Sequence, residues 1–172
     1  MITLATDTDL SELVPLLRDL NAQHTAYVPE RFRCRGTDAD LLGLLRSAAG
    51  RGTRFLIYRT EGVPRGYLGW RPHPVPEGAL LQPRLALLDH ITVEPIWRRR
   101  GLATRLIARF EVEVAAFDGW MVQGHAFNAA SRALMRRYGT RLMDGMVTPD
   151  QAGYLTCAPS AVISGPARSK RR

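Results

Sequence analysis

Apolar residues recur at helical spacing in four stretches of the chain. Residues 10–20 place leucine at positions 10, 13, 16, 17 and 20, which form one face of a helix, and residues 6–9 supply N-cap candidates. Comparable spacing covers residues 38–49, 102–114 and 129–138, and a glycine follows each stretch within a few residues. Residues 21–36 lack this periodicity, so we predict a connection there between the first two of four helices.

Runs of β-branched and aromatic residues predict strands between these helices. Short runs lie at residues 2–5, 55–58, 67–70 and 120–122. Residues 61–66 have the composition of a turn, which predicts an antiparallel hairpin. Residues 85–93 are largely apolar, as is typical of a central strand, and residues 140–156 predict one or two weaker strands. The element order predicts a mixed α/β sheet with helix N-termini above strand ends.

Length and composition predict one globular domain. The 172 residues are 45% hydrophobic and 23% charged, close to the average of globular domains. We predict a single domain over residues 1–158 and a basic, flexible tail over residues 159–172. The two cysteines, Cys34 and Cys157, show neither metal-ligand nor secreted-disulfide spacing, so no metal is expected. The start of the chain has no leader-like pattern and no run is apolar enough for a membrane span, so we expect a cytoplasmic protein.

The positive charge is concentrated at the end of the chain. The formal net charge is +8, and Arg168, Lys170, Arg171 and Arg172 supply +4 of it. Such a balance suits an anionic cofactor as well as nucleic acid, and charge alone does not separate the two.

A basic loop joins the predicted central strand to the third helix. Residues 93–104 read Val-Glu-Pro-Ile-Trp-Arg-Arg-Arg-Gly-Leu-Ala-Thr. A loop of this kind turns backbone N–H groups toward one point, and Gly101 and Ala103 let a ligand approach the backbone. The helix N-terminus adds about half a positive charge, and Arg98 or a neighbour can add a charge-assisted contact. The loop therefore predicts a phosphate site, with a solvated basic turn or a nucleic-acid patch as the alternative.

Two motifs resemble the GNAT superfamily of acyl-CoA-dependent N-acetyltransferases. The first, Arg98-x-x-Gly101-x-Ala103, matches the family's [QR]-x-x-G-x-[GA] hallmark and follows Ile91-x-Val93-x-Pro95. The second, at residues 128–139, is similar to the family's N-x-x-[AS] helix that ends in a glycine. The resemblance implies a GNAT-like mixed, mostly antiparallel central sheet flanked by helices, with a splayed cofactor cleft between two central strands.

The resemblance also implies acetyl-CoA as the co-substrate in that cleft. Its pyrophosphate would lie on the loop and its pantetheine arm along the central strand. The implied cofactor-binding residues are Ile91, Thr92, Val93, Arg98, Arg99, Arg100, Gly101, Leu102, Ala103, Thr104, Asn128 and Ser131. Asn128 has an alternative role as the N-cap of the fourth helix.

The implied reaction needs a base, because an alkylammonium of pKa ~10.4 is protonated at neutral pH and cannot attack a thioester. Asp89 looks like the position where several family members place a catalytic Glu or His, so we expect it to be the general base, with His90 in reserve. The alternative is that Asp89 is a strand-end residue satisfied by backbone N–H groups. Met135 occupies the position of the tyrosine that protonates the leaving thiolate in many members, so the general acid is not identified.

These features predict an N-acetyltransferase that transfers an acetyl group from acetyl-CoA to a primary amine of a small molecule, peptide or protein by direct attack in a ternary complex. The alternative is a non-catalytic CoA-binding module for regulation or interaction, supported by Met135 and the basic tail. We expect an amine-bearing acceptor, no membrane and no nucleic acid as partners. A homodimer would fit the sheet-edge pairing common in this fold.

Overall fold

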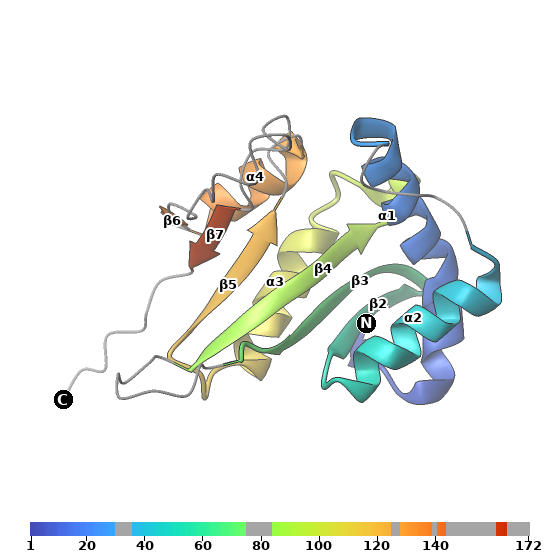
Figure 1. Cartoon of the computed structure of the whole chain (residues 1–172), viewed down its shortest axis with the longest axis horizontal. Helices are drawn as coiled ribbons and strands as arrows, with labels where there is room; N and C mark the ends of the chain where they lie inside the picture. The colour runs from blue at the N-terminus through green and yellow to red at the C-terminus, as the bar shows by residue number, and fades with distance from the viewer. Residues whose placement is uncertain (30–35, 75–83, 125–127, 139–140, 144–160, 165–172) are drawn as a thin grey trace, which may run out of the picture. The chain divides into compact units, whose positions relative to one another are not determined.

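The structure, a computed structural model, describes residues 1–29, 36–74, 84–124, 128–138, 141–143 and 161–164 (Figure 1). The chain forms two compact units. The first consists of Met1–Arg71 and His90–Glu113, and the second of Pro72–Asp89 and Val114–Arg172. The prediction of one domain over residues 1–158 stays a prediction.

The sheet of the first unit contains β1 (Ile2–Leu4), β2 (Arg54–Thr60), β3 (Val63–Pro72) and the end of β4 (Leu85–Val93), in that order (Figure 1). The pairings of β1 with β2 and of β2 with β3 are antiparallel, which confirms the predicted hairpin. The predicted turn over residues 61–66 was too long. Only Glu61 and Gly62 form it, with φ of 51° and 80°, because a two-residue turn with two positive φ angles matches the twist of the strands.

The described residues of this unit also form five helical segments: the 3₁₀ helices η1 (Asp7–Leu13) and η2 (Pro95–Trp97), and the α-helices α1 (Val14–Tyr27), α2 (Asp38–Gly50) and α3 (Leu102–Glu113). The connection predicted from residue 21 was wrong as far as Tyr27, because α1 continues to that residue. The sequence pattern did not predict this extension, because His24 lies four residues after Leu20, where an apolar residue would continue the apolar face of the helix. In the described part of the chain, no helix has the length and apolar character needed to cross a membrane.

Side chains of the first unit pack on both faces of its sheet. Residues on one face join a buried cluster with the helices before β2, and the cluster consists of Leu10, Leu13, Val14, Leu16, Leu17, Leu20, Leu41, Leu45, Phe55, Ile57 and Tyr67. On the other face, the ring of Trp70 lies edge-on to that of Phe110 in α3, with centroids 5.9 Å apart. Because successive side chains of a strand point to alternate faces of the sheet, Tyr67 and Trp70 of β3 lie on opposite faces.

The second unit holds the start of β4, β5 (Gly119–Gly124), α4 (Ala129–Arg136), β6 (Arg141–Met143) and β7 (Ala161–Ser164). Its strand order is β4-β5-β7-β6. β4 and β5 are parallel, with Leu85 opposite Gly119 and Leu88 opposite Val122, whereas β7 is antiparallel to both β5 and β6. The prediction of a mixed, mostly antiparallel sheet flanked by helices is confirmed. The predicted splayed cleft depends on how the two units are placed and stays a prediction.

One part of the predicted tail is structured. β7 lies within residues 159–172, so the prediction of a flexible tail was wrong for these four residues. A strand this short carries too few residues to show alternation, and its pairing with β5 and β6 is a long-range contact that no local pattern records. Residues 159, 160 and 165–172 lie outside the described residues, so the rest of the predicted tail, with its four basic residues, is not tested.

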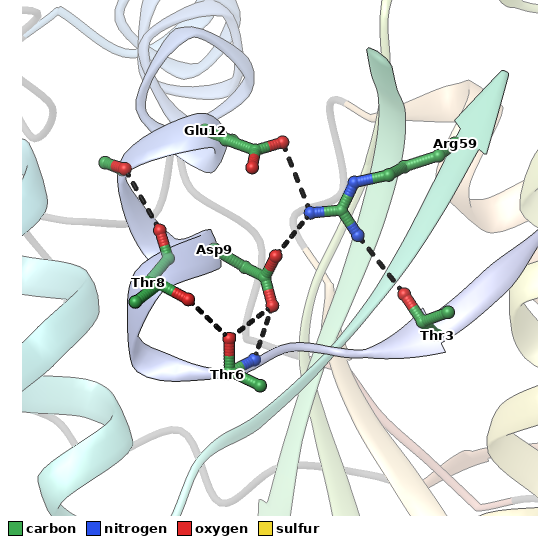
Figure 2. A network of polar contacts seen from close by, with 7 residues as sticks. Thr3, Thr6, Thr8, Asp9, Glu12 and Arg59 are labelled. Carbon is green, nitrogen blue, oxygen red and sulfur yellow. Dashed lines mark hydrogen bonds and ion pairs between the residues drawn. The ribbon is translucent and has the colours of Figure 1, made fainter. Parts of the chain in front are cut away.

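A polar network ties η1 to the edge of the sheet (Figure 2). The guanidinium of Arg59 in β2 donates to Asp9 Oδ1 at 2.7 Å, to Glu12 Oε2 at 3.2 Å and to Thr3 Oγ1 at 3.2 Å. The other oxygen of Asp9 accepts from the backbone N–H of Thr6 at 2.7 Å and from its hydroxyl at 2.6 Å. These bonds to Thr6, with the charge of Arg59, lower the pKa of Asp9 below its ordinary value of 3.8.

We predict that Asp9→Asn lowers the free energy of unfolding by ~1–2 kcal/mol near pH 7, the range for loss of an N-terminal cap with a charged partner. A lowered folded pKa stabilises the fold above the unfolded pKa and ceases to do so as pH falls through the folded value. Urea unfolding at several pH values should therefore show the difference from wild type shrinking below pH ~4. Asp7→Asn, which changes an exposed acid of the same turn, is the control; an equal loss in both variants would contradict a specific role for Asp9.

Candidate functional site

Two residues of the loop between β4 and α3 have a left-handed backbone conformation. Pro95 ends β4 and opens η2, after which Arg98 is extended with φ of −65° and ψ of 159°. Arg99 then has φ of 64° and Gly101 has φ of 78°. Positive φ in a residue other than glycine is uncommon, and alternating conformations of this kind turn neighbouring N–H groups toward one side.

The start of α3 presents backbone donors. The first bond within the helix runs from the N–H of Arg105 to the carbonyl of Gly101 at 3.0 Å, so the N–H groups of Leu102 and Ala103 have no acceptor inside the helix. Gly101 has no side chain to cap them, and a Cβ placed on it would meet nothing within 4 Å. Donors, open space and the positive end of the helix dipole together form a site suited to an anion.

Arg65 of β3 anchors this loop. Its Nη1 donates to Glu94 Oε2 at 2.8 Å, and its carbonyl accepts from the N–H of Glu94 at 2.9 Å. The guanidinium groups of Arg65 and Arg100 lie 5.1 Å and 4.9 Å from the ring centroid of Trp97. Two cations thus hold the indole of η2, one from β3 and one from the loop itself. Sequence reasoning missed Arg65 because its partner Glu94 is 29 positions away, and no local pattern links them.

Arg98 has a structural contact. Its Nε donates to the carbonyl of Val93 at 3.0 Å, so the side chain folds back onto the end of β4. This bond holds the two ends of the turn around η2 together. The expectation that Arg98 contacts a bound phosphate is not tested, whereas its role in shaping the loop is shown.

The two candidate bases lie next to each other on β4, and both are partly buried. The ring of His90 lies edge-on to that of Tyr67, with centroids 6.4 Å apart and an interplanar angle of 77°. His90 is thereby assigned to the sheet face of the leucine cluster that contains Tyr67. Alternation along the strand then gives Asp89 to the opposite face, so the two side chains cannot serve the same side of β4. Of the strand residues assigned to the pantetheine arm, Ile91 and Val93 are partly buried and Thr92 is buried.

The motif at the start of α4 forms a cap. Asn128 Oδ1 accepts from the N–H of Ser131 at 3.0 Å, so the capping alternative for Asn128 is correct. Met135 is buried, with 1% of its surface exposed, and a thioether has no proton to give. Tyr138 packs edge-on against Trp120 at 6.4 Å. Whether Asn128 and Ser131 also contact a cofactor is not tested. Within the described residues, no group of His, Cys, Asp and Glu could hold a metal ion.

Comparison with known proteins agrees with this geometry. The family model described as the acetyltransferase (GNAT) family matches residues 17–140, which include the loop, β4 and α4. The chain therefore belongs to the GNAT acetyltransferase family. No curated protein matches it.

Solved structures share the fold at low sequence identity. A tetramutant of the BH1408 protein from Bacillus halodurans is 15% identical with a TM-score of 0.73, covering 86% of this chain and 97% of that one. Ribosomal-protein-alanine N-acetyltransferase from Brucella melitensis is 22% identical with a TM-score of 0.64 and the same coverage. PaiA N-acetyltransferase from Thermoplasma acidophilum, in complex with coenzyme A, is 13% identical with a TM-score of 0.65, covering 97% and 99%.

We predict that Arg65→Met loosens the loop without unfolding the protein. The lost ion pair and cation–π contact are together worth ~1 kcal/mol, so amide hydrogen exchange over residues 94–101 should quicken about fivefold. Arg54→Met is the matched control, because it removes a guanidinium that lies 5.5 Å from Trp70 instead. Exchange in the loop that is equal in Arg65→Met and wild type would show that Arg65 does not anchor it.

Proposed function

We propose that this protein is an acetyl-CoA-dependent N-acetyltransferase that transfers the acetyl group directly to a primary amine in a ternary complex. The observation that carries the proposal is the left-handed loop at residues 99–101, which leaves the first N–H groups of α3 open in a chain of the GNAT family. Two structural relatives that share the fold carry the name N-acetyltransferase, which supports the reaction class.

The loop fits the pyrophosphate of coenzyme A. Backbone N–H groups near Gly101 supply donors without a side chain in the way, and the neighbouring arginines Arg99 and Arg100 supply positive charge. When bound, acetyl-CoA supplies an acetyl thioester. Residues Ile91, Thr92 and Val93 are the proposed partners of the pantetheine arm. The PaiA relative, whose structure contains coenzyme A, supports coenzyme A as the ligand.

The protein's own task is to remove a proton from the acceptor. An ammonium group of pKa ~10.4 must become an amine before it attacks, whereas a thiol of pKa ~8.5 leaves tolerably well without an acid. With Met135 buried at the position where other members have an acid, we assign the acid–base work to β4. Asp89 and His90 are the two candidates, one on each face of the strand.

We predict that Gly101→Asp weakens the binding of coenzyme A about tenfold or more, because a carboxylate intrudes on the phosphate site and repels it. Titration calorimetry with coenzyme A measures the change.

Gly52→Asp is the matched control, because Gly52 also has a positive φ, of 90°, and a Cβ placed on it would likewise meet nothing within 4 Å, but it lies beyond α2. The proposal fails if folded Gly101→Asp binds coenzyme A as wild type does. It also fails if both variants lose affinity equally, since backbone strain would then explain the loss.

We predict that one of two single variants, Asp89→Asn or His90→Gln, lowers the rate of transfer ~10²-fold with the affinity for coenzyme A unchanged, as expected for a lost general base. The assay follows thiol release from acetyl-CoA with a panel of amines and peptides. Near wild-type rates in both variants would exclude β4 as the source of the base. Binding of coenzyme A without thiol release above background for any acceptor would favour the non-catalytic module.

A further inference from the structure

Gly66 in β3 leaves room for a backbone carbonyl of β4. A Cβ placed on Gly66 would lie 2.8 Å from the carbonyl oxygen of Thr92 and 3.2 Å from Cγ2 of Val93. A side-chain carbon is essentially never that close to a backbone oxygen, so any other residue at this position would displace one of the two strands. Gly66 does not have the positive φ that calls for glycine elsewhere in the chain. The contact between the strands is therefore what requires glycine here.

This contact also sets the direction of the peptide group that joins Thr92 to Val93. In a planar trans peptide, the carbonyl and the N–H that follows it point in opposite directions. Because the Thr92 carbonyl faces β3 at Gly66, the N–H of Val93 faces away from β3. Within the described residues, β4 pairs with β5 only from Leu85 to Leu88. The N–H of Val93 thus points to a side of β4 where that ladder has already ended.

The next peptide group along β4 is held at both ends. Its carbonyl, that of Val93, accepts from Arg98 Nε at 3.0 Å, and its N–H, that of Glu94, donates to the carbonyl of Arg65 at 2.9 Å. The end of the strand therefore has little freedom to move as a whole. A displaced Thr92 carbonyl would instead turn the peptide group between Thr92 and Val93, and the N–H of Val93 would turn with it.

We propose that Gly66 is a positioning residue for coenzyme A: because it leaves room for the Thr92 carbonyl, the N–H of Val93 is directed to donate to an amide carbonyl of the pantetheine arm. The inference rests on the proposed function and deepens it, because Val93 is one of the residues proposed to contact that arm. An N–H···O bond needs about 2.7–3.2 Å between nitrogen and oxygen. An alanine Cβ would have to move from 2.8 Å to 3.4 Å from the Thr92 oxygen to make an ordinary contact, a shift larger than the whole of that range.

The test compares Gly66→Ala with Gly69→Ala in the same strand. A Cβ on Gly69 would lie 3.0 Å from Cε1 of Phe55, so the control also inserts a methyl group into a tight contact, but against a side chain. Titration calorimetry measures the affinity for coenzyme A and for its nucleotide half, phosphoadenosine diphosphate, which carries the phosphates and lacks the pantetheine arm. We expect Gly66→Ala to weaken the binding of coenzyme A about tenfold, as for one lost hydrogen bond, and to leave the binding of the nucleotide half unchanged. Gly69→Ala should bind both ligands as the wild type does.

A glycine that serves the packing of the sheet alone would give a different result. Gly66→Ala would then unfold at a lower urea concentration but bind both ligands with wild-type affinity. That result would overturn the proposal. An equal loss of affinity for both ligands, or a loss of affinity for coenzyme A in Gly69→Ala as large as in Gly66→Ala, would also overturn it.

Amide hydrogen exchange of the wild-type protein gives a second measurement, which decides the proposal if Gly66→Ala does not fold. We expect coenzyme A to slow the exchange of the Val93 N–H about tenfold, and the nucleotide half to leave it unchanged. Equal exchange of this N–H with and without coenzyme A would overturn the proposal. If the wild type bound neither ligand, the proposed function itself would fail, whereas binding of coenzyme A without these effects at Val93 and Gly66 would overturn the inference alone.

Discussion

The close approach of β3 and β4 at Gly66 is the constraint on which the site depends. A Cβ on Gly66 would lie 2.8 Å from the carbonyl oxygen of Thr92, a distance that no side chain tolerates. Because Gly66 allows this approach, Arg65 reaches Glu94 and Trp97 on one side of it, and Tyr67 reaches His90 on the other. The anchoring of the β4–α3 loop and the packing of His90 against Tyr67 thus follow from a single backbone contact.

The fold could be predicted from the sequence wherever the local pattern agreed with the packing. β4 has the predicted bounds because a largely apolar run of nine residues admits few other structures. α2 was predicted well because Thr37 and Asp40 form a capping box that the sequence displays. The prediction was wrong where long-range packing determines the structure. β7 forms through its pairing with β5, which no local pattern shows. α1 continues to Tyr27, although its last turn carries a histidine where an apolar residue was expected.

In the candidate site, too, only the parts that a local sequence pattern records could be predicted. The loop could be predicted because its residues are contiguous, so one motif contains both the glycine and the start of the helix. Arg65 and Tyr67 could not be predicted, because each contacts a partner more than twenty positions away, and the sequence does not state the strand register that brings them together. Asp89 and His90 were both predicted as candidates, but only the structure shows that the ring of His90 lies against that of Tyr67.

The arginine at position 99 adds backbone strain to the loop but leaves it more ordered than a glycine would. A left-handed residue other than glycine costs ~1–2 kcal/mol, and glycine at this position would remove that cost. Glycine would also lose more conformational freedom on folding and would remove one of three consecutive positive charges from the β4–α3 loop. The contacts of Trp97 with two guanidinium groups offset part of the strain, since they hold the chain before and after Arg99. The energy that rigidifies the loop therefore comes from arginine side chains, which also give the loop its charge, and the glycine is kept for Gly101, where the first N–H groups of α3 must stay accessible.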